Sequence, residues 1–162
     1  MQRALLLVSF VTACAQPVPT AAPAEPASGG EAEVAEAPPP PASNEPVCTS
    51  NGFMMYEASE TAYASRTGLG VERFAELSTS HEKPLEECGL EPILIRLASM
   101  LCNDGSNPFQ GNLGAAHRSR RGNVGPGGRC GAVVDLYAVP CPERTYDVFA
   151  DLYFCPAGQS PR

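Results

Sequence analysis

The sequence predicts a small α+β domain that is cross-linked by disulfide bonds, and three observations lead to this fold class. Six of the seven cysteines lie in residues 47–162, an even number in a stretch that has the size of one domain. Residues 92–102 have the apolar spacing of a core helix. Residues 132–139 and 145–154 are rich in β-branched and aromatic side chains, which is typical of a β-hairpin.

The chain begins with a leader that is typical of exported proteins. Arg3 precedes an apolar run, and small residues follow up to Cys14. The run is far shorter than the roughly 20 residues that a membrane-spanning helix needs. We therefore expect residues 1–13 to be a cleaved signal peptide. An ordinary secretory signal is the alternative, but it would leave Cys14 as a seventh, unpaired cysteine.

The sequence VTAC at residues 11–14 resembles the lipobox of bacterial lipoproteins, in which a branched apolar residue and two small residues precede a cysteine. The resemblance implies that Cys14 is acylated and becomes the first residue of the mature protein. Three acyl chains hold a protein on a membrane where one chain does not. The next residue is Ala15 and not Asp, which in that family implies the outer membrane. We therefore expect a cell-envelope protein whose membrane partner is reached through the lipid anchor, on either the periplasmic or the outer face.

Residues 14–46 are expected to be a disordered tether between the anchor and the domain. Residues 15–46 contain nine Pro, nine Ala and five Glu, and no aromatic side chain. Such a segment buries too little apolar surface to offset the entropy of ordering its backbone. Residues 47–162 carry thirteen acidic and ten basic side chains, so their charge does not predict a nucleic-acid partner.

The first half of the domain gives weaker patterns. Residues 47–56 indicate a hairpin or a single strand around Asn51-Gly52. Ser59 is a suitable cap for a short helix that would run to Thr67 and stop at Gly68, and residues 71–78 have a second helical spacing.

The core helix is expected to begin at Pro92, because proline suits a first helical turn, and to end at residues 103–105. Its expected apolar stripe comprises Ile93, Leu94, Leu97, Ala98 and Leu101. Residues 104–108 are expected to form a turn and not a calcium loop. Half of residues 122–131 are Gly, and we expect neither helix nor strand there.

Two signals disagree on the register of the expected hairpin. A two-residue turn at 142–143 would bring Cys130 opposite Cys155, but it would also place Asp135 on the apolar face. Because an unpaired buried carboxylate costs several kcal/mol, we expect a register shifted by one residue. A bulge at Gly131 would then allow the favoured disulfide, Cys130–Cys155.

The other four cysteines leave two pairings open. Cys88 and Cys102 lie at opposite ends of the core helix, roughly 15 Å apart, which is too far for a disulfide. Cys48 is therefore expected to pair with one of them, and Cys141 with the other.

The densest positive charge accompanies the Gly-rich segment, and it comprises Arg118, Arg120, Arg121 and Arg129. These side chains, with nearby backbone amides, suit an anionic glycan, lipid or protein partner. The alternative is that they pair with acidic residues of the same chain, which are Glu86, Glu87, Asp147 and Asp151.

His81 and His117 are the only histidines, and neither has the spacing of a metal ligand, so no metal or cofactor is expected. The sequence favours a non-catalytic binding or structural domain on a lipid anchor. A small hydrolase that uses His117 and Asp135 is the alternative, although no nucleophile-elbow motif is present. A third hypothesis is an inhibitor-like scaffold with a rigid loop between disulfides.

Overall fold

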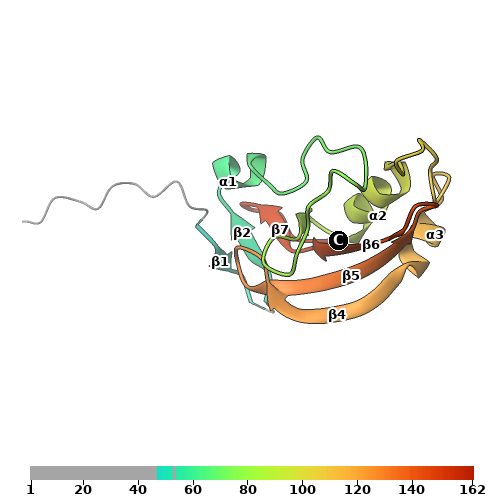
Figure 1. The fold of residues 1–162 in the computed structure, drawn as a ribbon. Helices are drawn as coiled ribbons and strands as arrows, with labels where there is room; N and C mark the ends of the chain where they lie inside the picture. The colour runs from blue at the N-terminus through green and yellow to red at the C-terminus, as the bar shows by residue number, and fades with distance from the viewer. Residues whose placement is uncertain (1–46, 53) are drawn as a thin grey trace, which may run out of the picture. The chain divides into compact units, whose positions relative to one another are not determined.

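The computed structural model describes residues 47–52 and 54–162, so the expected leader and tether lie outside the described residues. The elements in chain order are β1 (Thr49–Ser50), β2 (Tyr56–Ala58), α1 (Glu60–Ala64), β3 (Leu85–Glu86), α2 (Leu90–Ser99), α3 (Leu113–Arg118), β4 (Arg120–Gly127), β5 (Ala132–Pro140), β6 (Thr145–Asp151) and β7 (Phe154–Pro156). Strands β1, β2 and β7 form one sheet, and β3, β6, β5 and β4 form a second (Figure 1). The mixture of helix and sheet agrees with the α+β class.

The N-terminal hairpin is confirmed as β1 and β2. The strands are antiparallel with Thr49 opposite Glu57, and the backbone N–H of Asn51 donates to the carbonyl of Met55 at 3.1 Å. Strand β7 adds to β2 in parallel, with Tyr56 opposite Phe154. The small sheet therefore joins the first and the last strands of the described chain.

The helices differ from the expected ones at their ends. Helix α1 is capped by Ser59, whose hydroxyl accepts from the N–H of Ala62, but it stops at Ala64 and does not reach Thr67. Residues 71–78 form no helix, because Phe74 pairs with Leu101 through a 3.0 Å backbone hydrogen bond. Helix α3, which was not predicted, is capped by the side chain of Asn112.

The core helix is present as α2, shifted toward the N-terminus. It buries Ile93, Leu94, Leu97 and Ala98 of the expected stripe. It ends at Ser99 because Met100 is already extended and the N–H of Leu101 donates to the carbonyl of Glu72. The pairing of Leu101 with another segment thus prevents the last expected turn.

The first part of the Gly-rich segment, residues 122–127, lies in a strand, which corrects the expectation that its composition excludes one, whereas residues 128–131 form a turn. Strand β4 pairs with β5, and its register shifts twice, between Arg120 and Gly122 and between Asn123 and Pro126. Gly122 and Gly125 adopt φ angles of 138° and 101°, which side chains rarely tolerate. Glycine therefore permits the irregular backbone of this edge strand.

The hairpin of β5 and β6 has the register that sequence reasoning rejected. Val139 lies opposite Tyr146 and Asp135 opposite Ala150, so the connection is the two-residue turn at 142–143. Asp135 therefore lies on the face of β5 that also carries Tyr137 and Val139, and it is 3% exposed. The expected second strand is also interrupted after Asp151, where the chain leaves β6 and enters the other sheet as β7.

Three disulfides are present, but the favoured pair Cys130–Cys155 is wrong. Cys130 pairs with Cys48, and Cys155 pairs with Cys88. The two cysteines separate because Cys155 belongs to β7, which lies in the small sheet. The third disulfide, Cys102–Cys141, is one of the two alternatives that the spacing left open.

The main core lies between the four-stranded sheet and helices α2 and α3. Its fully buried side chains include Phe74, Leu85, Ile93, Leu97 and Tyr137. A second, smaller cluster forms around Ala58, Ala62, Cys130 and Phe154 under the small sheet.

Candidate functional site

Three of the expected candidate residues, His117, Arg120 and Asp135, line one groove, which we call the sheet groove, with a volume of about 310 Å³. Its lining residues are Leu90, His117, Arg120, Asn123, Val133, Asp135, Leu152 and Tyr153. Helices α2 and α3 lie at the same end of the four-stranded sheet (Figure 1). Their packing covers Tyr137 and Val139, and the groove is the next part of that sheet face, toward Asp135 and Val133.

An ion pair with a buried carboxylate lines the groove. Arg120 of β4 donates from Nε to Asp135 Oδ2 at 2.7 Å and from Nη2 to Asp135 Oδ1 at 2.8 Å. The Asp135 side chain is 4% exposed, whereas that of Arg120 is 39% exposed. The hydrogen bond to Asp135 raises the pKa of Arg120. This pair explains why the carboxylate can occupy the apolar face, since both of its oxygens have a charged donor.

His117 lies in the last turn of α3 and is exposed. Within the described residues its side chain makes no hydrogen bond or ion pair. Because both Asp135 oxygens accept from Arg120, no carboxylate orients this imidazole as a general base would need. The groove therefore brings His117 and Asp135 together without the linked nucleophile, base and orienting acid of a hydrolase.

Two tyrosines add hydroxyl groups to this region. Tyr153 lines the groove. Tyr137 is fully buried, and burial, with a smaller effect of the Asp135 charge, raises the pKa of Tyr137 to about 12. Its hydroxyl has no hydrogen-bond partner among the described residues. A phenol whose pKa is raised, as that of Tyr137 is, is a poor nucleophile at neutral pH.

The four expected arginines serve different roles. Arg120 is committed to Asp135, and Arg129 is committed to Glu86 through its Nε and Nη2, at 2.8 and 2.5 Å. Arg129 also lies over the Phe154 ring, 4.6 Å from its centroid. Pairing within the chain is therefore the correct alternative for Arg129.

Arg118 and Arg121 remain exposed. They have no acidic partner in the part of the chain that the structure describes. Arg118 ends α3, and Arg121 lies at the first register shift of β4. Each is next in sequence to a residue that lines the sheet groove, Arg118 to His117 and Arg121 to Arg120.

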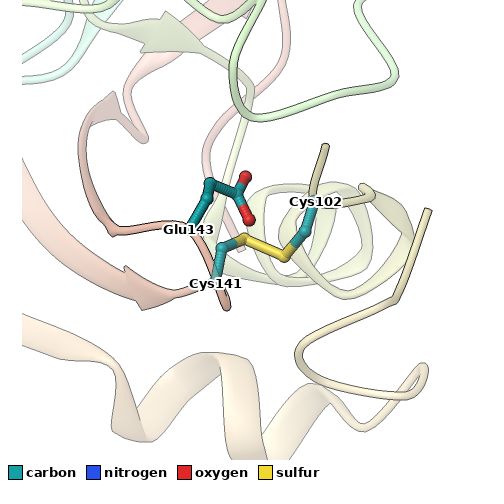
Figure 2. Close-up of side chains that lie close together, drawn as sticks. All are labelled: Cys102, Cys141 and Glu143. Carbon is teal, nitrogen blue, oxygen red and sulfur yellow. A yellow bond between two sulfur atoms is a disulfide. The ribbon is translucent and has the colours of Figure 1, made fainter. Parts of the chain in front are cut away.

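One cluster has the ligand types of a metal site but does not fit a metal. Cys102, Cys141 and Glu143 bring their ligand atoms within 4.8 Å of one another (Figure 2). The two sulfur atoms are joined as a disulfide and are not thiolates, which are the form that binds metal. Glu143 Oε1 already accepts from the N–H of Asn103 and from the Tyr146 hydroxyl. The first of these hydrogen bonds lowers the pKa of Glu143.

In a second charged cluster Glu86, Glu87 and Asp151 are buried. The sequence identified these acids as possible partners of the arginines but did not predict their burial. Glu87 forms an ion pair with Arg66 at 3.2 Å, and burial raises the pKa of Glu87. The sequence gives one signal of this burial, which is that Glu86 and Glu87 stand between an apolar residue, Leu85, and a cysteine expected in a disulfide, Cys88. A run of two glutamates otherwise indicates a solvated loop.

A larger hollow, of about 720 Å³, lies between the start of α2 and the segment 158–162, and none of the expected catalytic or arginine residues lines it. No described helix is long and apolar enough to cross a membrane. Comparison of the chain with models of protein families, with curated proteins and with solved structures found no match.

Proposed function

We propose that this chain is a lipoprotein of the cell envelope, anchored in the outer membrane through Cys14, whose folded domain binds a carboxylated glycan without catalysing a reaction. The lipobox-like residues 11–14 support the anchor. The tether of residues 15–46 supports presentation of the domain away from the lipid surface.

The observation that carries the non-catalytic assignment is the Arg120–Asp135 pair. It engages both oxygens of Asp135, the only carboxylate that lines the sheet groove, while His117 has no orienting partner in the described chain. Arg118 and Arg121 lack an internal acid in the described chain, are exposed, and are next in sequence to His117 and Arg120, which line this groove. The apolar side chains of Leu90, Val133 and Leu152 and the ring of Tyr153 offer a surface for the faces of sugar rings. Cationic and polar groups at its edge then suit carboxylates.

The test uses the charge-reversed double variant Arg118→Glu/Arg121→Glu and a matched pair of ligands. The ligands are polygalacturonate, which carries one carboxylate per sugar, and its uncharged methyl ester. We expect the wild-type domain to bind the acid form, and the double variant to bind it at least about tenfold more weakly, because like charges replace attractive ones. Isothermal titration measures both affinities.

Lys83→Glu is the control, because Lys83 is exposed and lies outside the groove. It changes net charge without changing the candidate surface. Equal binding of the methyl ester, or equal losses in the control and the double variant, would contradict the proposal.

Hydrolysis is the second candidate function, because the structure places His117 and Asp135 in the lining of one groove. In this case a bound substrate would have to displace Arg120 from Asp135. His117→Ala would then abolish the hydrolysis of a panel of ester and amide substrates. A wild-type domain that turns over no member of the panel argues against this alternative.

A further inference from the structure

Three ionisable side chains from three segments meet near the junction of the two sheets. Glu86 of β3 and Asp151 of β6 are Cα partners in a parallel pair, so their side chains lie on the same face of the sheet. Arg129 comes from the turn between β4 and β5 and donates to both oxygens of Glu86. Glu86 and Asp151 are both 0% exposed.

The two carboxylates are not equally supplied with donors. Glu86 accepts from Arg129 and also from the N–H of Thr67 at 2.7 Å. Asp151 Oδ1 accepts from the N–H of Tyr153 at 2.8 Å, but Oδ2 is buried without a donor among the described residues. One guanidinium, that of Arg129, is therefore the nearby positive charge for two buried carboxylates, and both of its hydrogen bonds to a carboxylate go to Glu86.

Charge balance then favours a proton on Asp151. With both acids ionised the cluster would hold an uncompensated negative charge away from water, which is costly. Burial, with a smaller effect of the Glu86 charge, raises the pKa of Asp151 from 3.8 to about 7. The hydrogen bond from Tyr153 and the charge of Arg129 oppose this shift.

The same cluster holds a defined loop in place. Residues 127–131 approach β6 through Gly128, whose N–H donates to the carbonyl of His81 at 2.9 Å and whose added Cβ would lie 3.4 Å from Asp151 Oδ2. Arg129 follows directly, and Cys130 is bonded to Cys48 ahead of β1. The loop thus connects the charged cluster to the small sheet.

We propose that Asp151, Glu86 and Arg129 form a pH-dependent latch. Asp151 is protonated while the loop 127–131 is closed, and the loop opens more readily as the pH rises. The other ionisable groups near Asp151 are His81, whose imidazole lies against Gly127, the Glu87 and Arg66 pair that follows Glu86, and Tyr153. Val134, the partner of Asp151 on β5, is apolar. The latch does not depend on the ligand of the sheet groove.

The direction of the effect follows from linkage. A carboxyl group whose pKa is higher in the closed state stabilises that state fully below its ordinary pKa, and this stabilisation is lost as the pH rises to the closed-state value. The opening constant of the loop should therefore rise between pH 4 and 7, by up to about tenfold for each pH unit, and level off above that.

The test measures Asp151 directly in the whole domain. Carbon-13 NMR of the carboxyl groups should show a midpoint near 7 for Asp151 in the wild-type protein. Amide exchange at Gly128, corrected for its intrinsic pH dependence, should rise from pH 5 to 7 in the wild type. It should stay nearly constant in Asp151→Asn, which keeps the shape of the protonated acid. Asp147→Asn, an exposed position on the same strand, should behave as the wild type does.

A midpoint of the wild-type Asp151 carboxyl below about 5, which approaches the ordinary value, would overturn the proposal. So would the same pH dependence of exchange in the wild type and in Asp151→Asn. Glu86→Gln supplies an independent check, because it removes the neighbouring charge and frees Arg129 for Asp151. The midpoint of Asp151 should then fall, and an unchanged midpoint would contradict the coupling of the two acids.

Discussion

At the scale of single residues, Asp135 of β5 forms an ion pair with Arg120 of the neighbouring strand β4. A register that places a carboxylate on the apolar face is unfavourable when no partner for the carboxylate is known. Here the two hydrogen bonds from Arg120 to Asp135 make that register favourable. Arg120 precedes Asp135 by fifteen residues and lies just before a Gly-rich segment that was not predicted to be a strand. The sequence could therefore identify both residues as candidates but could not show that they neutralise each other.

Replacing Arg120 by Ala should destabilise the domain, because it leaves a buried carboxylate without its partner. Removal of one member of a buried pair costs about 3 to 5 kcal/mol, and the partial exposure of Arg120 reduces this to about 2 to 3 kcal/mol. Urea unfolding at neutral pH measures the loss. Arg121→Ala is the control, and it should change stability by less than about 0.5 kcal/mol. Equal effects of the two substitutions would contradict the structural role of Arg120.

Replacing Cys14 by Ser should release the protein from membranes, since the lipobox-like motif supplies the only cysteine ahead of residue 48. The measurement is the partition of the protein between the soluble and the detergent-extracted fractions of cells. A Ser variant that remains wholly in the membrane fraction would rule out the anchor. Mass spectrometry of the native amino terminus provides an independent check.

At the scale of elements, periodic patterns were more informative than composition. The apolar spacing of residues 92–102 located α2 to within a few residues, because burial on one face is a local property of the chain. The ends of α2 and the break between β6 and β7 depend on partners far away, such as Glu72 and the small sheet. Strand β4 was missed because its glycines disfavour a strand, whereas pairing with β5 stabilises one.

The glycines of β4 give a test at this scale. Gly125→Ala should destabilise the domain by about 1 kcal/mol or more, because φ of 101° is strained for any residue with a side chain. No atom lies within 4 Å of the added Cβ, so the loss would come from the backbone alone. Gly114→Ala in α3 is the contrasting variant, because that position does not have a positive φ. Thermal unfolding of both proteins separates the cases, and a Gly125→Ala protein as stable as the wild type would contradict the strained conformation.

At the scale of the whole molecule, three disulfides connect segments that local structure leaves far apart. Their sequence separations are 82, 67 and 39 residues. The even cysteine count predicted the number of bonds, but pairing depends on which sheet each cysteine enters. Cys155 was assigned to the large hairpin, and its actual place in β7 gives it Cys88 as a partner.

These bonds should dominate the stability of the domain. Each loop of this length removes enough unfolded-chain entropy to stabilise the fold by about 4 kcal/mol in the chain-entropy model. Alkylation without reductant should find no reactive thiol in residues 47–162, and alkylation after reduction should find six. The reduced domain should unfold at a much lower urea concentration. Two or more free thiols in the native protein would contradict the three-bond framework.

The Cys48–Cys130 bond also determines how the domain responds to tension. Cys48 is the second residue of the described chain, ahead of β1, and its disulfide leads to the turn just before β5, a central strand of the larger sheet. A pull applied through the preceding residues passes into that strand by covalent bonds and bypasses β1 and β2. The weak, two-residue pairing of the N-terminal hairpin is therefore shielded from the load, and it cannot be unzipped from that side while the sulfur–sulfur bond is intact.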